Sequence, residues 1–492
     1  MAGERDPLAP ARAGSRRRAR GWISTPGGRR VLWETTRRGA HALVTGPTGV
    51  GKSQDQKGQA LQRLRAGERV VIMGAAKGHD AEDLYAHWLP VFGPRWGISP
   101  TDVTVFAPFK GVAVPLNFCS EVPGIPRDER AALVADILGK MAGEAFGPRM
   151  SRMLMRGLRV SRSLVELHRL LTDETFRRAV VSRIDDPVDR QYWSVEFDSE
   201  PAASALALAA RLDRHVLALS DMRAMFNARG CLAGEALLGS RLTVLDLGGA
   251  PMGLPGLPSM VGSLLLMLLL AAVMSRPDRD VPVTVYLDEF HVLAEGSGID
   301  LERALQLSRE QGVGWELATQ SLGALRNPAL VDALLVNVAT WTAFRPRQED
   351  VRLLSHVLPE SLSRMVDPEV PDRLLSPADA RARWERRLRA LPRQTALYAD
   401  LVNGTSQVLV TGTLPLAAVV REAARVPAEL RERYRLGRLG RRAQDLEAFD
   451  GSTSSPPAPA VPVADNTIPW PSAPARSGAR RGPSRRPALE LP

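Results

Sequence analysis

The sequence predicts an α/β protein with a mainly parallel β-sheet, an all-α insertion and disordered ends. Over much of the chain, short apolar runs alternate with helical segments, which is the pattern of a parallel sheet covered on both faces. Between about 127 and 240 this alternation stops, and apolar residues recur at helical spacing. The two ends are rich in Arg and Pro and carry few apolar runs.

The strands of the predicted sheet are the short runs rich in Val, Leu, Ile and Thr. We expect parallel strands at 41–45, 69–74, 103–107, 242–247, 283–287, 315–319 and 341–345. Two later runs, TALYADL and QVLVTGTL, are typical of a final antiparallel pair. The sheet is therefore assembled from segments that lie on both sides of the helical insertion.

The chain of 492 residues is longer than one ordinary domain, so we expect a core with additions. The predicted parts are a basic flexible arm at 1–38, the first part of the core at 39–126, a mostly helical insertion at 127–240, the second part of the core at 241–420, a C-terminal helical segment at 421–450 and a disordered Pro/Ser/Arg-rich tail at 451–492. Residues 1–38 contain no long apolar stretch, so we do not expect a signal peptide there.

The charge balance points towards an acidic partner such as DNA or a membrane surface, but the excess of arginine over lysine is more suggestive of a GC-rich genome than of a polyanion-binding groove. The formal net charge is +11, and nearly all of the 65 basic residues are arginines. Basic runs at 16–20 and 476–486 could bind DNA or membrane, or could simply be solvated. The two cysteines, Cys119 and Cys231, lack the spacing of a zinc site and suit a reducing cytoplasm. We expect a cytoplasmic protein, at most peripheral at the inner face of the cell membrane.

One segment, LPSMVGSLLLMLLLAAVM at 257–274, is nearly long enough to cross a membrane. It lies between two strand-like runs, TVLDL and VTVYL. A helix that is apolar on all sides can also be buried in protein. We therefore predict a buried helix of the α/β layers.

The stretch GPTGVGKS fits the phosphate-loop pattern G-x-x-x-x-G-K-[ST], between a strand and a helix. Its glycines allow backbone N–H groups to curl around phosphates at the N-terminus of the helix. Lys52 should reach the β and γ phosphates, and Ser53 should ligate Mg²⁺. The predicted nucleotide-binding residues are Gly46, Pro47, Thr48, Gly49, Val50, Gly51, Lys52 and Ser53. The expected cofactors are ATP and Mg²⁺.

Hydrolysis needs an acidic element as well, and YLDEFH supplies Asp288 and Glu289 at the end of an apolar strand. There they would face the phosphates across the carboxyl edge of the sheet. We assign Asp288 to the Mg²⁺ site and Glu289 to orientation and polarisation of the attacking water.

Three further residues are catalytic candidates. Gln320, in ATQS, lies where a γ-phosphate sensor would sit, although it could also be a polar strand cap. Arg309 and Arg345 are candidates for an arginine finger that reaches a neighbour's nucleotide. In so arginine-rich a chain each could instead be a surface residue.

Together these elements resemble the HerA/FtsK superfamily of hexameric DNA-pumping ATPases, and within it the coupling ATPases of type IV secretion and conjugation. The resemblance spans about 40–415. Besides GPTGVGKS it includes VVIMGAAKGHD with Lys77 and Gly78, VAVPLNF with Leu116 and Asn117, LTVLDLGG, YLDEFH, ATQSLGAL and NVATWTAFRPRQEDVRLL, in the order of the family.

The resemblance implies a RecA-like P-loop NTPase core and a homo-hexameric ring with active sites at subunit boundaries. It also implies sequence-independent DNA binding in the central channel. Its implied partners are a relaxase or secretion-channel proteins. Membrane-anchored coupling proteins begin with transmembrane helices; this sequence shows none at its start, so we expect a form without that anchor.

Three functions follow as hypotheses. The first is a DNA-translocating ATPase for conjugative transfer. The second keeps the motor but changes the load, as in a secretion-channel ATPase that moves protein or a HerA-like motor for DNA repair or packaging. The third is a nucleotide-dependent assembly factor with slow turnover.

Overall fold

The structure is a computed structural model of the 492-residue chain. It describes residues 17–25, 28–35, 39–74, 81–142, 146–251, 253–254, 256–276, 279–296, 301–325, 328–357, 376–411 and 416–448. The predicted disordered tail at 451–492 lies outside these residues, as do Lys77 and Gly78.

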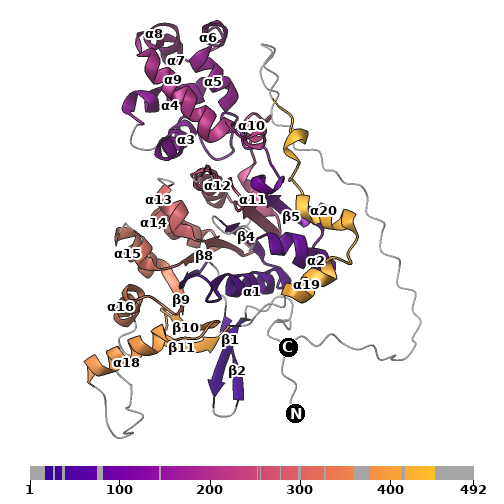
Figure 1. The fold of residues 1–492 in the computed structure, drawn as a ribbon, viewed down its shortest axis with the longest axis vertical. Helices are drawn as coiled ribbons and strands as arrows, with labels where there is room; N and C mark the ends of the chain where they lie inside the picture. Colours follow the sequence, from indigo (N-terminus) through magenta and orange to yellow (C-terminus); the bar gives the residue numbers. More distant parts are fainter. Residues whose placement is uncertain are drawn as a thin grey trace, which may run out of the picture.

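An 11-stranded sheet in the order β2-β1-β11-β10-β9-β3-β8-β7-β4-β6-β5 forms the centre of the molecule (Figure 1). Seven neighbouring strands, from β9 to β5, are parallel. They are β3 (His41–Thr45), β4 (Arg69–Gly74), β5 (Val103–Phe106), β6 (Leu242–Asp246), β7 (Val283–Asp288), β8 (Val313–Thr319) and β9 (Val338–Phe344). Every parallel strand predicted from the sequence is confirmed, and so is the mainly parallel α/β fold.

Antiparallel strands extend the sheet beyond β9. The predicted pair is β10 (Thr395–Asp400) and β11 (Thr405–Val410). Next to β11 lies a hairpin of β1 (Arg17–Thr25) and β2 (Gly28–Thr35), joined to the sheet at Trp22 opposite Val410. Residues 17–25 and 28–35 of the predicted flexible arm thus form a hairpin in the structure, and it meets β11 at this one pair.

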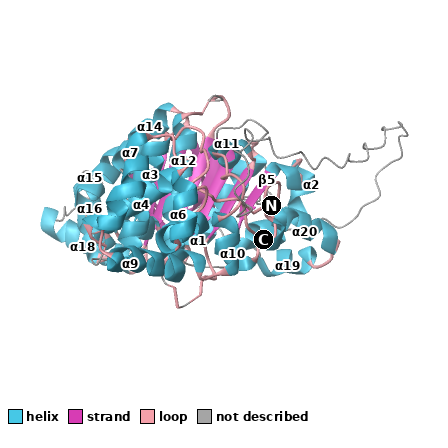
Figure 2. Ribbon diagram, turned by 90° about the horizontal axis from the view of Figure 1, so that it is seen from above, coloured by secondary structure: helices cyan, strands magenta, loops and turns pink. Residues whose placement is uncertain are grey.

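Helices cover both faces of the sheet (Figure 2). Helices between consecutive parallel strands are α1 (Lys52–Arg65), η1 (Leu84–Trp88), α2 (Leu89–Trp96), α12 (Leu257–Met274), α13 (Phe290–Gly296), α14 (Leu301–Glu310) and α15 (Pro328–Asn337). Two more, α16 (Gln348–Val357) and α18 (Pro377–Arg389), lie between β9 and the antiparallel β10. Parallel strands require such crossovers, and helices supply them here.

The described residues of the predicted insertion at 127–240 form mostly helices, joined by loops and by isolated β-bridges at Ala228 and Cys231. Its elements are α3 (Arg127–Ala142), α4 (Pro148–Val160), α5 (Leu164–Thr172), α6 (Glu174–Val181), α7 (Pro187–Gln191), η4 (Tyr192–Glu196), α8 (Phe197–Ser199), α9 (Ala202–Leu212), η5 (Asp213–Leu217), α10 (Ser220–Phe226) and α11 (Gly234–Gly239). The helices α3 to α9 lie at the end of the molecule opposite the β1–β2 hairpin, whereas α11 lies beside α12 (Figure 1).

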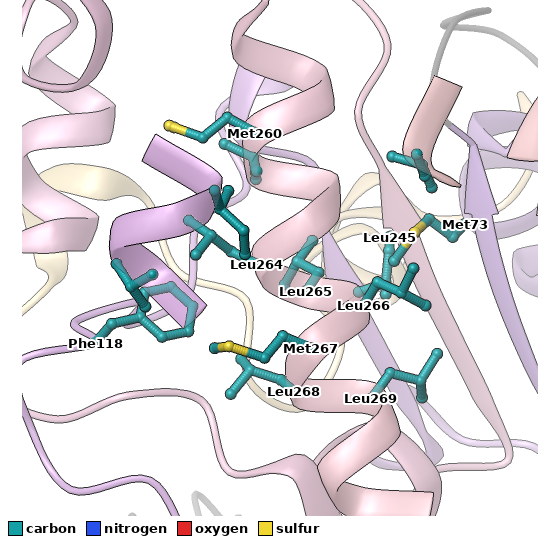
Figure 3. Packing of buried hydrophobic residues seen from close by; sticks show 14 of the residues in the cluster. Met73, Phe118, Leu245, Met260, Leu264, Leu265, Leu266, Met267, Leu268 and Leu269 are labelled. Carbon is teal, nitrogen blue, oxygen red and sulfur yellow. The ribbon is translucent and has the colours of Figure 1, made fainter. Parts of the chain in front are cut away.

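Helix α12 is the only described helix that is long and apolar enough to cross a membrane. Within this fold 72% of that stretch is buried. Its leucines pack against Met73 and Leu245 from the sheet on one side and against Phe118 on another (Figure 3). The prediction of a buried helix is confirmed, because α12 joins the sheet to the helical insertion in one core.

The C-terminal segment closes the far edge of the sheet. After α19 (Leu416–Ala423) and α20 (Ala428–Leu436) the described chain contains one short 3₁₀ helix, η7 (Ala443–Asp445), and no further α-helix up to 448. Gly437 bridges Thr104 of β5, and Ala448 bridges Ala228 at the end of the insertion. Because β5 is an edge strand, this cover protects its backbone groups from pairing with another chain.

Candidate functional site

The predicted phosphate loop connects β3 to α1 with three glycines in conformations that other residues rarely adopt. Gly46, Gly49 and Gly51 have φ values of 147°, 83° and 120°. At Gly46 an added Cβ would lie 2.3 Å from the carbonyl oxygen of Phe344. Position 46 therefore needs glycine both for its backbone conformation and for the close approach of β9.

The lysine of the loop begins helix α1 and is buried. Its Nζ donates to the carbonyl oxygens of Gly46 and of Pro47, the latter at 3.0 Å. Ser53 follows in the first turn of the same helix. The first N–H groups of a helix have no intrahelical acceptor, so this turn presents donors and a favourable dipole to an anion.

The predicted acids lie at the same edge of the sheet. Strand β7 ends at Asp288 and is separated from β3 only by β8, so two inter-strand steps of about 5 Å each separate the loop from the acids. Glu289 has a φ of 52° and is 2% exposed. This unusual backbone conformation at a buried acid is the kind of local strain found at functional sites.

Gln320, directly after β8, lies between the loop and the acids. Its Nε2 donates to Oε1 of Glu289 at 3.3 Å. The other oxygen of Glu289 lies 3.5 Å from Nδ1 of His291, which is itself 3.1 Å from the Thr319 hydroxyl. The carboxylate is thus held from β8 and from the start of α13.

The two arginine candidates lie at opposite ends of the parallel strands, Arg345 at their carboxyl ends and Arg309 at their amino ends. Arg345 follows β9 beside the phosphate loop, has a φ of 40°, and its Nε donates to the carbonyl of Arg389 at 3.2 Å. Arg309 lies near the end of α14, where its carbonyl oxygen would be 2.6 Å from a Cβ at Gly39, before β3 begins. The structure therefore brings Arg345, but not Arg309, to the edge that carries the loop of the same chain.

Asp350, at the start of α16, belongs to this region but was not predicted. It is fully buried, and its Oδ1 accepts from the Ser321 hydroxyl at 3.0 Å and from the Leu322 N–H at 2.8 Å. Burial raises the pKa of Asp350 to about 6. Its two hydrogen bonds fix the turn after Gln320. The sequence carries no specific sign of this role, because an acid in the first turn of a helix is common.

A second polar cluster, also not predicted, lies further along the same edge. Nζ of Lys110 is 2.7 Å from Oδ2 of Asp246 and 2.9 Å from Glu82, and the Tyr85 hydroxyl donates to the same Asp246 oxygen at 3.2 Å. Burial raises the pKa of Asp246, and this effect outweighs the ion pair with Lys110, which lowers the pKa. The cluster joins the ends of β5 and β6 to η1.

His41, the first residue of β3, is a buried structural residue at the amino ends of the parallel strands, away from the phosphate loop. The Trp315 N–H donates to its Nδ1 at 3.1 Å, so Nε2 carries the proton and donates to the Leu305 carbonyl at 2.8 Å. Burial lowers the pKa of His41 to about 4. The neutral ring thereby ties the strand of the phosphate loop to α14 and β8.

Among the described residues, no group of three or more His, Cys, Asp or Glu side chains gathers to hold a metal ion. Mg²⁺ in nucleotide sites commonly uses one or two protein ligands together with phosphates and waters. Ser53 and Asp288, across the carboxyl edge from each other, fit that smaller requirement.

No protein-family model matches the sequence, and no curated protein matches it. Solved structures do match. The bacterial conjugative coupling protein TrwBdeltaN70 has 17% identity over 76% of this chain and 85% of its own, with a TM-score of 0.47. TrwB in complex with a non-hydrolysable ATP analogue has 16% identity over 76% and 86%, with a TM-score of 0.49. VirB4 of Thermoanaerobacter pseudethanolicus has 13% identity over 82% and 97%, with a TM-score of 0.48.

The structures that match most of this chain are thus those of a conjugative coupling protein and of VirB4. At these identities and TM-scores, the matches by themselves assign no activity to it.

Proposed function

We propose that this chain is an ATP-hydrolysing motor that moves DNA through a ring of its own copies, as a coupling ATPase of conjugative transfer or type IV secretion does. The observation that carries the hydrolase part is the position of Lys52, Ser53, Asp288, Glu289 and Gln320 at one edge of the sheet. The resemblance over 40–415 carries the DNA and ring parts.

The binding step uses the loop and the start of α1. Backbone N–H groups of the glycine-rich loop surround the phosphates, and Lys52 moves its ammonium group from the carbonyls of Gly46 and Pro47 to the phosphate oxygens. Ser53 and Asp288 would hold Mg²⁺, and the bound ion would neutralise charge on the transferred phosphoryl group.

The hydrolytic step uses Glu289 and Gln320, which lie at the same carboxyl edge of the sheet as the phosphate loop. Glu289 accepts a hydrogen bond from the attacking water and takes up its proton. Because Gln320 already donates to Glu289, it is placed to register whether the neighbouring γ-phosphate position is filled. Arg345 can act on the nucleotide of its own chain, whereas Arg309, at the other edge, can act only on that of a neighbouring subunit.

The test is ATP hydrolysis by the purified chain with no DNA, with single-stranded DNA and with double-stranded DNA, with the oligomer size measured by light scattering in the same buffers. We expect DNA to stimulate hydrolysis, and Lys52→Ala and Glu289→Gln to abolish it. Lys140→Ala, which removes a half-exposed lysine from the insertion, is the matched control.

Each outcome has a definite meaning. DNA-stimulated hydrolysis by a ring supports the motor. Hydrolysis that ignores DNA, together with nucleotide-dependent assembly, would replace the motor with an assembly factor. An active Lys52→Ala variant would contradict the site itself.

A further inference from the structure

A turn far from the phosphate loop in the sequence holds that loop from outside. The turn consists of Arg393 and Gln394, between α18 and β10. Nε of Arg393 donates to the carbonyl oxygen of Gly49 at 2.9 Å, and the Gln394 N–H donates to the carbonyl of Val50 at 2.7 Å. Two consecutive carbonyls in the middle of the loop are therefore bonded to one turn.

These two bonds matter for anion binding because of how a phosphate loop works. Its N–H groups must point inward to the phosphates, so the carbonyls of the same peptide units point outward. A donor that binds the outward carbonyls holds the inward N–H groups in place before any nucleotide arrives. Such preorganisation lowers the cost of ordering the loop on binding.

The turn is itself held rigidly. Gln394 has a φ of 58°, unusual for a residue other than glycine, and the N–H and hydroxyl of Thr411 both donate to its carbonyl oxygen, at 2.7 and 3.1 Å. Its Cα lies 3.3 Å from where a Cβ on Gly51 would be. Below the loop, Val50 packs in a small core with Val44, Ala318, Phe344 and Ala396.

We propose that Arg393 is a positioning residue of the nucleotide site, which holds the phosphate loop in its anion-binding shape through the carbonyl of Gly49. This inference rests on the proposed nucleotide binding. In this role Arg393 lowers the cost of ordering the loop when the nucleotide binds, so it acts on the affinity for the nucleotide and hardly on the rate of the bound complex.

The experiment compares Arg393→Ala, Arg393→Lys and wild type by equilibrium binding of a fluorescent ATP analogue with Mg²⁺ and by steady-state hydrolysis. One hydrogen bond from a charged donor to a carbonyl at an exposed site predicts a Kd and KM raised roughly three- to tenfold in Arg393→Ala, with kcat at saturating ATP nearly unchanged. Lysine retains a cationic donor and should restore part of the affinity.

Arg386→Ala is the matched control, because Arg386 is an exposed arginine in the helix before the turn. It removes the same charge and should leave Kd at the wild-type value. Arg393 is exposed as well, so its variants should keep the wild-type melting temperature without nucleotide.

The results separate this inference from the proposed function. Wild-type protein that binds no nucleotide would refute the function itself. Wild-type binding with an unchanged Kd in Arg393→Ala, an equal loss in Arg386→Ala, or a fall in kcat at unchanged KM would overturn the positioning role alone.

Discussion

Replacing His41 with glutamine should remove one specific part of the pH dependence of folding. The ring is 1% exposed, neutral, and bonded through both nitrogens to α14 and β8. Its pKa falls from the ordinary 6.5 to about 4 in the folded chain. The unfolded chain therefore binds a proton between these values that the folded chain does not, and stability is lost as the pH falls from 6.5 towards 4.

The size of the effect follows from the two pKa values. At pH 7 both states are mostly neutral, so the penalty is a few tenths of a kcal/mol at most; at pH 5 it reaches about 2 kcal/mol. Glutamine does not titrate. The difference in unfolding free energy between wild type and His41→Gln should therefore shrink by about 2 kcal/mol from pH 7 to pH 5.

The assay is urea unfolding followed by tryptophan fluorescence at both pH values, with the slope against urea checked for constancy. Comparing the two proteins cancels the contributions of other titrating groups, such as Asp350, whose raised pKa makes the chain more stable as the pH falls. Deuterium exchange at the His41 imidazole, read by mass spectrometry, gives its pKa directly. A stability difference that stays constant between pH 7 and pH 5, or a His41 pKa near 6.5, would refute the reasoning.

Two other substitutions have definite expected outcomes. Asp350→Asn should stabilise the chain by up to about 3 kcal/mol at pH 7, because the buried carboxyl, whose pKa of about 6 lies above the ordinary 3.8, is ionised there at a cost. The gain should disappear below pH 3.8, where wild type is protonated in both states, and urea unfolding at pH 7 and at about pH 3 checks this. Gly46→Ala should abolish nucleotide binding and cost about 2 kcal/mol or more of stability, because the added Cβ would lie 2.3 Å from the carbonyl oxygen of Phe344. Binding of a fluorescent ATP analogue and a melting curve check this. A near-normal affinity would contradict the close packing of the loop against β9.

The parallel strands could be predicted because each is a short run of β-branched and apolar residues next to a helical segment, and burial on both faces selects that composition. The phosphate loop and the acid pair could be predicted because their chemistry requires fixed residue types at fixed spacing. The hairpin β1–β2 was missed because its many arginines suggested a solvated arm. The signal that could have identified it is the Pro26-Gly27 pair between two runs of strand-forming residues.

The remaining site residues could not be predicted because their roles depend on tertiary contacts. His41 and Trp315 are 274 residues apart, and Arg393 and Gly49 are 344 residues apart. No local pattern distinguishes Arg393 from the many other arginines of this chain. Whether Arg309 lies at the carboxyl or the amino ends of the strands likewise depends on how the chain folds, which short motifs do not determine.

The position of β3 has a consequence for the order of events during synthesis. This strand leaves the ribosome among the first, yet both of its sheet neighbours, β8 and β9, are made only after residue 312. Until then the nascent segment has no partners for its backbone hydrogen bonds, and the turn at 393–394 that braces the loop comes later still. A chain released early would therefore carry the complete phosphate-loop motif without a pocket able to hold a nucleotide.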